Sequence, residues 1–389
     1  MRTIARILAG AITALVILFT LAGVLSAVVN LGRPTVSATP DRLSPAAQAQ
    51  LVEFFHAHKT LGDAVWPGWG TADIPVIAYN EANAFLAGLA DPAEGWVKVP
   101  QGNPRGRPWE PAGELPDGRP LYRQPLVDGE TPQAFTVRVG DRWVASLTTM
   151  EWLRIGLANQ MREDLPPVVN LAFPYDLATR QLVGSSAHYI SLVAHEAFHA
   201  YQGATAPDRL AAAERAAARE NAYPWDDAAL EAAWQAELDL LAEAAAAPPE
   251  EAGEYARAFL QLRAERRDAA GLNPALVDYE RQREWLEGLA RYAELGLWRE
   301  AAADYQPSVA ASDDPEFDGY NDYEKRLTRE IGQIGRMAGD AGDGRFYYSG
   351  FAQAVLLDHL APDWKARAFA PDVFLEDLLR EAVSLAVKE

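Results

Sequence analysis

Two histidines and a glutamate stand close together in an apolar stretch near the middle of the chain, in the sequence His195-Glu196-Ala197-Phe198-His199. On a helix the two histidines lie one turn apart on the same face, where a single metal ion can bind both imidazoles. Neutral imidazole nitrogens suit Zn²⁺. Glu196 projects from the adjacent edge, where it can take a proton from a metal-bound water as the water attacks a carbonyl group. The spacing therefore predicts a zinc site with Glu196 as general base.

The alternative is an ordinary helix that carries these residues by chance. The chain has only six histidines, however, and a buried Glu196 without a partner would be costly. The surrounding positions are apolar and predict a buried helix, with Ser185 or Ser186 as its cap and Gly203 as its end. His188 lies two turns before the motif, too far to share the metal, and either lines the cleft or faces solvent.

A catalytic zinc site usually has three protein ligands and a water, so one more ligand is needed. A third histidine at short spacing is excluded, because Gln202 and Thr205 occupy the positions where such a motif has Gly and His. A carboxylate from the helix predicted at residues 275–302 is the alternative. One face of that helix carries a stripe of charged residues, namely Glu280, Glu284, Glu287, Arg291 and Glu294.

Glu287 is favoured within this stripe. The small residues Gly288 and Ala290 permit another helix to approach closely, and the apolar pair Trp285-Leu286 indicates burial. The competing interpretation is a solvated stripe with a Glu287–Arg291 ion pair. Glu284 is the next candidate for the ligand.

The combination of His195-Glu196-x-x-His199 with a distant Trp285-Leu286-Glu287-Gly288-x-Ala290 resembles the gluzincin metallopeptidases, which include thermolysin-like enzymes and zinc aminopeptidases. The resemblance implies a zincin-like core, Zn²⁺ bound by His195, His199 and Glu287, and a peptide or protein substrate. Two departures limit it. The gap between the two motifs is much longer than in the aminopeptidases, and their Gly-x-Met-Glu-Asn segment is absent, so exopeptidase specificity is not implied.

Peptide hydrolysis also needs a group that stabilises the oxyanion, and gluzincins often use a tyrosine or histidine across the cleft. Tyr347 and Tyr348, at the start of a C-terminal helix, are the candidates; either could equally be a core residue. His359 is a weaker one.

Composition narrows the class of protein further. The chain has 389 residues and a net charge of −20. This charge argues against binding to nucleic acid and against binding to an anionic membrane through a basic patch. It has no cysteine, so disulfides and thiolate ligands are excluded.

The N-terminus predicts a membrane anchor. Arg2 and Arg6 precede an uncharged run of 23 residues, 7–29, which as a helix would be about 34 Å long and would cross a bilayer. The arginines favour a cytoplasmic N-terminus and place the remainder of the chain outside the cytoplasm. The alternative is a cleaved signal with a small-residue site at Val36-Ser37-Ala38, which would leave the protein secreted.

The pattern of the whole chain predicts an α+β fold, predominantly helical, with a small sheet before the motif helix. We expect four parts, namely an anchor or signal at 1–30, a linker at 31–45, an α/β lobe at 46–165 and a mostly helical zinc-site lobe at 166–389. Alternation around Gly140-Asp141 predicts a hairpin, and the apolar run 168–173 predicts a short strand. His56 and His58, in a helix predicted at 46–62, are expected at the surface.

These observations favour a membrane-anchored, extracytoplasmic zinc metallopeptidase. Two other functions stay open. One is a noncatalytic helical binding or scaffold module with a structural zinc site, which would need a fourth protein ligand. The other is a zinc hydrolase that acts on a non-peptide bond with the same metal, base and water.

Overall fold

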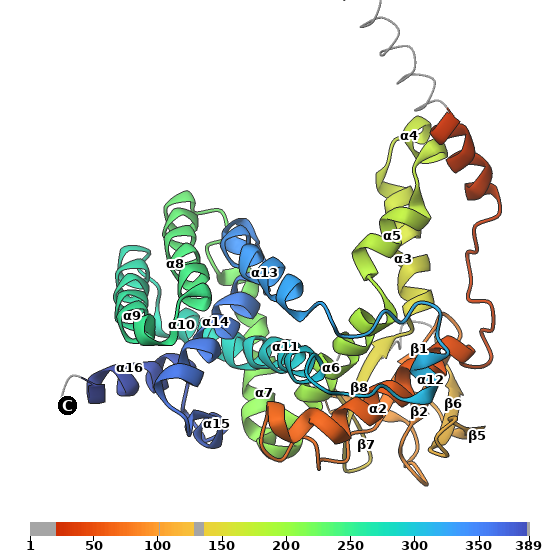
Figure 1. Ribbon diagram of the computed structural model, residues 1–389, viewed down its shortest axis with the longest axis horizontal. Helices are drawn as coiled ribbons and strands as arrows, with labels where there is room; N and C mark the ends of the chain where they lie inside the picture. The colour runs from red at the N-terminus through yellow and green to blue at the C-terminus, as the bar shows by residue number, and fades with distance from the viewer. Residues whose placement is uncertain (1–20, 101, 128–135, 387–389) are drawn as a thin grey trace, which may run out of the picture.

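The computed structural model describes residues 21–100, 102–127 and 136–386 (Figure 1). It is α+β and mostly helical with one mixed sheet, which confirms the predicted fold class at this level. The helices are α2 (Pro45–Val65), α3 (Met150–Asp164), α4 (Pro167–Ala172), α5 (Tyr175–Val183), α6 (Ser186–Thr205), α7 (Pro207–Ala216), α8 (Ala228–Ala246), α9 (Ala252–Ala269), α10 (Pro274–Arg283), α11 (Leu289–Ala301), α12 (Val309–Ser312), α13 (Tyr323–Ile334), α14 (Gly344–Leu360), α15 (Trp364–Arg367) and α16 (Leu375–Ala386). Shorter 3₁₀ turns are η1 (Ala217–Ala222), η2 (Pro249–Glu251) and η4 (Gly335–Gly339), and the π-helical turn η3 (Glu284–Gly288) joins α10 to α11.

The sheet precedes the motif helix, as predicted. Its strands are β1 (Val76–Tyr79), β2 (Asn83–Ala87), β3 (Trp96–Lys98), β4 (Pro104–Arg105), β5 (Glu110–Glu114), β6 (Pro120–Pro125), β7 (Val137–Val139) and β8 (Arg142–Thr148). Their order is β4-β3-β7-β8-β1-β2-β6-β5, with β1 and β8 parallel and the other neighbours antiparallel. β7 and β8 form the hairpin expected around Gly140-Asp141.

The two faces of the sheet pack into separate hydrophobic cores. In β1, Val76 and Ala78 enter the large core beneath the helices, whereas Ile77 and Tyr79 enter a smaller core on the opposite face. This alternation follows from the two-residue period of a strand. The motif helix α6 packs on β8 and on α11, and α2 packs on both helices. The helix that carries the His-Glu-x-x-His motif is therefore held between the sheet and the helix that follows Glu287.

The long helix predicted at 275–302 is present but is not a regular α-helix. It contains the π turn η3, which includes Glu287. A side chain at Gly288 would collide with the backbone of Gly350 in α14, so the two helices touch at their glycines. This close contact confirms that small residues beside Glu287 admit another helix. Single π turns of this kind are frequent at functional sites.

Two local predictions are wrong. The apolar run 168–173 is not a strand, since Pro167–Ala172 forms the short helix α4 with a proline in its first turn. A short apolar run has no clear period, so its pattern alone does not separate strand from helix. His58 is buried rather than at the surface, where it stacks on Phe54 and meets Trp69 edge-on, whereas His56 is exposed as predicted.

The predicted anchor is only partly within the described residues, because 7–20 lie outside them. Residues 21–31 form a helix, and an irregular segment follows as far as α2. Within the described ranges, no helix has the length and apolar character needed to cross a membrane.

Candidate metal centre

The motif helix α6 begins where the sequence predicted. Ser185 is its N-cap, and the Ser185 hydroxyl accepts a hydrogen bond from the backbone N–H of His188. Gly203 lies inside the helix and does not end it as expected. Its role is in packing, because a side chain there would collide with the indole of Trp143 on β8. The glycine lets α6 lie close against the sheet.

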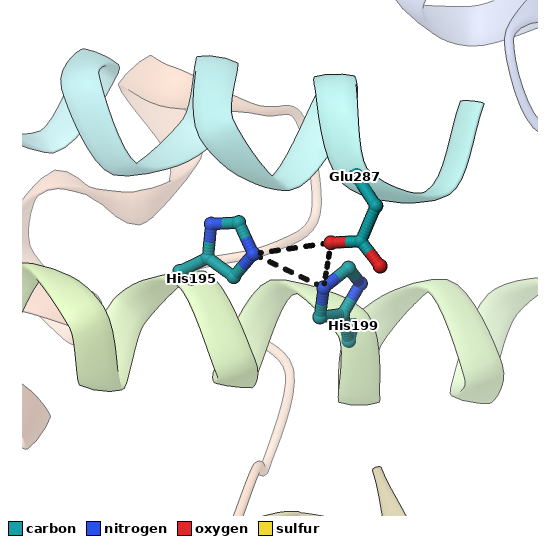
Figure 2. A group of neighbouring side chains, drawn as sticks. All are labelled: His195, His199 and Glu287. Carbon is teal, nitrogen blue, oxygen red and sulfur yellow. Dashed lines mark hydrogen bonds and ion pairs between the residues drawn. The ribbon is translucent and has the colours of Figure 1, made fainter. Parts of the chain in front are cut away.

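The structure brings His195, His199 and Glu287 together, with all three side chains buried (Figure 2). The Nε2 atom of His195 lies 3.2 Å from Nε2 of His199 and 3.5 Å from Oε2 of Glu287. The Nε2 atom of His199 lies 3.3 Å from the same carboxylate oxygen. Among the described residues, this is the group of histidine and carboxylate side chains placed to share a metal ion.

The size of this triangle fits a tetrahedral metal ion. With metal–ligand bonds of 2.0–2.1 Å, ligand atoms stand about 3.4 Å apart in a tetrahedral site and about 2.9 Å apart in an octahedral one. The observed separations of 3.2–3.5 Å match the tetrahedral value. Two imidazoles and one carboxylate form a donor set that zinc accepts.

The hydrogen bonds around the histidines fix which ring nitrogens are free. Gln202 donates its amide N–H groups to the carbonyls of Trp285 and Leu286, so its Oε1 must be the acceptor that lies 2.8 Å from Nδ1 of His199. The carboxylate of Glu294 lies 3.5 Å from Nδ1 of His195. Both Nδ1 atoms therefore carry protons, and both Nε2 atoms present lone pairs to the centre of the triangle.

Glu287 presents a third acceptor there. Arg283 donates to its Oε1 at 2.7 Å and is itself held by Asp343. The other oxygen, Oε2, is buried and has no hydrogen-bond donor. Three buried acceptors thus converge with no donor among them. Such an arrangement is costly unless a proton or a metal cation lies between the acceptors, so the residues fit a metal ion.

The carboxylates around the triangle favour a positive charge at its centre. Burial would lower the pKa of His195, but the carboxylates of Glu287 and Glu294 outweigh it and raise the pKa of His195 to about 10. Burial would likewise raise the pKa of Glu287, yet His199, Arg283 and His195 hold it well below its usual range. The field that favours a proton on His195 is the field that a divalent cation would experience.

Glu196 sits beside the triangle and does not join it. Burial raises the pKa of Glu196, and the carboxylates of Glu287 and Glu294 add to this effect while the two histidines oppose it. A carboxylate with a raised pKa is better matched to accepting a proton near neutral pH than an exposed one. The position and environment of Glu196 suit the role of general base.

The two candidate tyrosines differ in where they point. The ring of Tyr347 stacks on His195, with centroids 5.5 Å apart, and its hydroxyl interacts with Glu287. Tyr348 instead hydrogen-bonds Glu330 and Arg291, away from the triangle. Burial raises the pKa of Tyr347 well above its usual value, so the hydroxyl keeps its proton and can donate it in a hydrogen bond.

Several charged residues that the sequence placed near the site lie elsewhere. Glu284, the second candidate ligand, bonds Arg263 and Ser349 in a separate cluster. His188 is bonded by Arg326 at 2.6 Å, and burial and this arginine lower its pKa to about 4. His359 is exposed.

Gln202, Glu294 and Arg283 were not assigned roles from the sequence. Gln202 was visible only as a departure from a histidine motif, and Glu294 only as a member of the charged stripe. Comparison with family models, curated proteins and solved structures gives no match to this chain. The geometry of the site and the resemblance of its two motifs to gluzincins therefore carry the functional argument.

Proposed function

We propose that this protein is a zinc-dependent metallopeptidase of gluzincin type. The observation that carries the proposal is the triangle of three buried acceptors, His195 Nε2, His199 Nε2 and Glu287 Oε2, at tetrahedral spacing. Glu196 and Tyr347 lie next to it. Three protein ligands and one open position are the pattern of a catalytic zinc site.

The protein's residues divide the chemistry as follows. Zinc in this position would acidify a water molecule and polarise a carbonyl group. Glu196 takes a proton from the attacking water and passes it to the leaving amine. Tyr347 donates a hydrogen bond to the oxyanion that develops on the carbonyl oxygen. Gln202 and Glu294 keep both imidazoles in the orientation and tautomer that metal binding requires.

A structural zinc site would have four protein ligands. Among the described residues, the cluster holds three. This count supports a hydrolase over a noncatalytic scaffold. The choice of a peptide bond rests on the resemblance to gluzincins, and a zinc hydrolase of another bond remains the second candidate because it would use the same residues.

We further propose that the protein is anchored in a membrane through residues 7–29, with the catalytic region outside the cytoplasm. The support is the uncharged run of 23 residues that follows Arg2 and Arg6. The net charge of −20 supports a function without nucleic acid.

The decisive experiment is elemental analysis of the full chain in detergent, with a matched pair of variants. Glu287→Ala removes a proposed ligand, so we expect about one zinc per chain in the wild type and a metal affinity more than about 100-fold lower in the variant, beyond the effect of losing an outer-shell partner. Glu284→Gln changes a carboxylate one turn earlier that bonds Arg263, and it should keep its zinc.

Loss of zinc from Glu284→Gln but not from Glu287→Ala would overturn the ligand assignment. Zinc-loaded wild type is then tested on a library of quenched fluorescent peptides, beside ester and amide substrates that contain no peptide bond. Cleavage confined to the second set would remove the peptidase assignment and leave the zinc hydrolase.

A further inference from the structure

Large hydrophobic side chains on the surface are concentrated at one end of the molecule. Of the thirteen that are exposed among the described residues, eleven fall in 21–36 or 169–182. The other two are Val309 and Leu385. In Figure 1 the helices α3, α4 and α5 project from the sheet, and the helix at 21–31 lies beside α4 at their far end. An apolar surface gathered in this way usually marks an interaction site.

The helix at 21–31 turns its small residues towards the protein and its large aliphatic residues outwards. Its small or polar residues Gly23, Ser26, Ala27 and Asn30 recur at helical spacing and are partly buried. Gly23 faces Ala172 of α4. The large aliphatic residues on the other side, namely Leu21, Val24, Leu25, Val28 and Val29, are exposed. A helix that packs against a protein in water normally buries its aliphatic face, whereas one that meets lipid exposes it.

The tip of the projection is joined to this helix. The Asn30 side chain donates hydrogen bonds to the carbonyls of Leu171 and Phe173, at 3.1 and 3.0 Å. The Arg33 guanidinium lies 5.0 Å from the ring centre of Tyr175. These contacts hold the end of α4 at the same level as the end of the apolar helix.

The tip is itself apolar. Residues 165–175 contain no charged side chain, and Arg162, Glu163, Asp164 and Asp176 mark the limits of this stretch. Val169 and Leu171 in the tip and Leu177 just beyond it are exposed. Their exposed fractions are 47%, 62% and 59% within the described part of the chain.

We propose that this tip, residues 165–175 with Leu177, is a second membrane contact whose partner is the interfacial layer of a lipid bilayer. The proposal rests on the anchor proposed above, because the aliphatic stripe of 21–31 continues the uncharged sequence that begins at residue 7. A bilayer is favoured over a second copy of the chain because the exposed stripe belongs to a run long enough to reach across the bilayer. With the anchor, the tip gives two points of attachment.

Two points of attachment orient the catalytic part. A domain that is joined to a membrane helix by one flexible linker can rotate freely. A second contact with the membrane restricts the orientation of the domain relative to the bilayer. Helix α3 has 15 residues and is about 22 Å long, so it separates the tip from the sheet by roughly this distance. The metal centre would then face substrates held at a set height above the bilayer.

The absence of cysteine makes this proposal simple to test on the full chain. Single cysteines are introduced as Leu171→Cys, Leu177→Cys and, as a matched control, Leu385→Cys, which is equally exposed but far away on α16. Each is labelled with a polarity-sensitive fluorophore and reconstituted in phosphatidylcholine vesicles. We expect a blue-shifted emission at 171 and 177 that is lost when the lipids carry nitroxide groups, and neither effect at 385.

The outcomes separate the two proposals. A chain that does not float with the vesicles overturns both the anchor and the contact. If the chain floats with the vesicles but the labels at 171 and 177 are as exposed to water as the label at 385, only the contact is overturned. Labels that are shielded from water yet not quenched by nitroxide lipids would show that protein covers the tip, which also overturns it. None of these results alters the zinc analysis.

Discussion

Four buried glutamates on one continuous helical segment, α10–η3–α11, have two different kinds of surroundings. Glu280 and Glu284 lie in an arginine cluster, which we define as Arg263, Arg266, Arg267 and Arg281 with Glu237, Glu280, Glu284 and Glu376. Every carboxylate oxygen in that cluster meets an arginine. Farther along, Glu287 has one oxygen bonded by Arg283 and one with no donor. Glu294 is paired with Arg291 and Arg326 and also lies beside His195.

The difference between the two regions shows how a structural network of ion pairs can be distinguished from a metal-binding site. The arginine cluster ties α8, α9, α10, η3 and α16 together, and its charges are balanced within it. The metal centre is equally buried, but its acceptors point at one another. A closed network holds helices together, whereas buried acceptors that converge on one point fit a site that binds a cation.

The sharpest test of this contrast is the substitution Glu196→Gln. The amide keeps the shape of the side chain but accepts no proton, so we expect the rate of peptide hydrolysis to fall about 10²–10⁴-fold while zinc content stays at the wild-type level. The same chemical change in the arginine cluster, Glu284→Gln, should leave the rate nearly unchanged. Equal loss of activity in both variants would mean that the centre has no special chemistry.

Tyr347 and Tyr348 provide the next comparison, since one faces the centre and the other joins a closed ion network. Tyr347→Phe should lower kcat about 10²–10³-fold with little change in KM, because it removes a hydrogen bond to the oxyanion. Tyr348→Phe loses only its bonds to Glu330 and Arg291 and should keep its activity. The reverse result would assign the oxyanion donor to Tyr348.

Gln202 connects the two metal-binding helices, and its removal should have a smaller effect. Gln202→Leu deletes the acceptor for His199 Nδ1 and the bonds to the η3 carbonyls, so we expect zinc affinity to fall about 10–100-fold. With saturating zinc, kcat should recover.

Gln202→Glu is the control for this substitution. Its carboxylate still accepts the histidine proton but cannot donate to the carbonyls, so its zinc affinity should lie between those of the wild type and Gln202→Leu. A loss of kcat that zinc does not restore in Gln202→Leu would contradict a purely positioning role.

The sequence predicted those parts of the fold and the candidate site that depend on local spacing. His195 and His199 need only one helical turn, and Glu287 was marked by Gly288 and by apolar neighbours. The role of Gln202 depends on contacts with a segment more than 80 residues away, which no local pattern records. The choice between Tyr347 and Tyr348 depends on the rotation of α14 at the Gly288–Gly350 contact. The sequence of the short helix α4 predicts a strand, because six residues carry too little periodicity to separate the two.

The smallest effect on the metal centre is expected from a substitution of Glu280, which lies in α10 at the start of the segment that carries Glu287. Burial alone would raise the pKa of Glu280, but Arg266, Arg267 and Arg263 outweigh it and lower the pKa of Glu280 to about 2 from an ordinary value of 4.5. Because the folded state holds this carboxylate ionised, the stabilisation is complete above pH 4.5 and is lost as the pH falls towards 2. Over that range it amounts to roughly 3 kcal/mol.

Glu280→Gln should therefore be less stable than the wild type at pH 7, by about 3–5 kcal/mol, since it leaves buried arginines without their partner. The gap in the free energy of unfolding should begin to close below pH 4.5 and lose more than half of its pH-dependent part by pH 3, where the wild-type carboxylate also loses its advantage. Urea unfolding at a series of pH values measures the gap, and zinc analysis at pH 7 should find the metal retained. A gap that stays constant down to pH 3 would show that Glu280 is not held ionised by the arginines, and loss of zinc would show that the cluster and the centre are not the separate structures proposed.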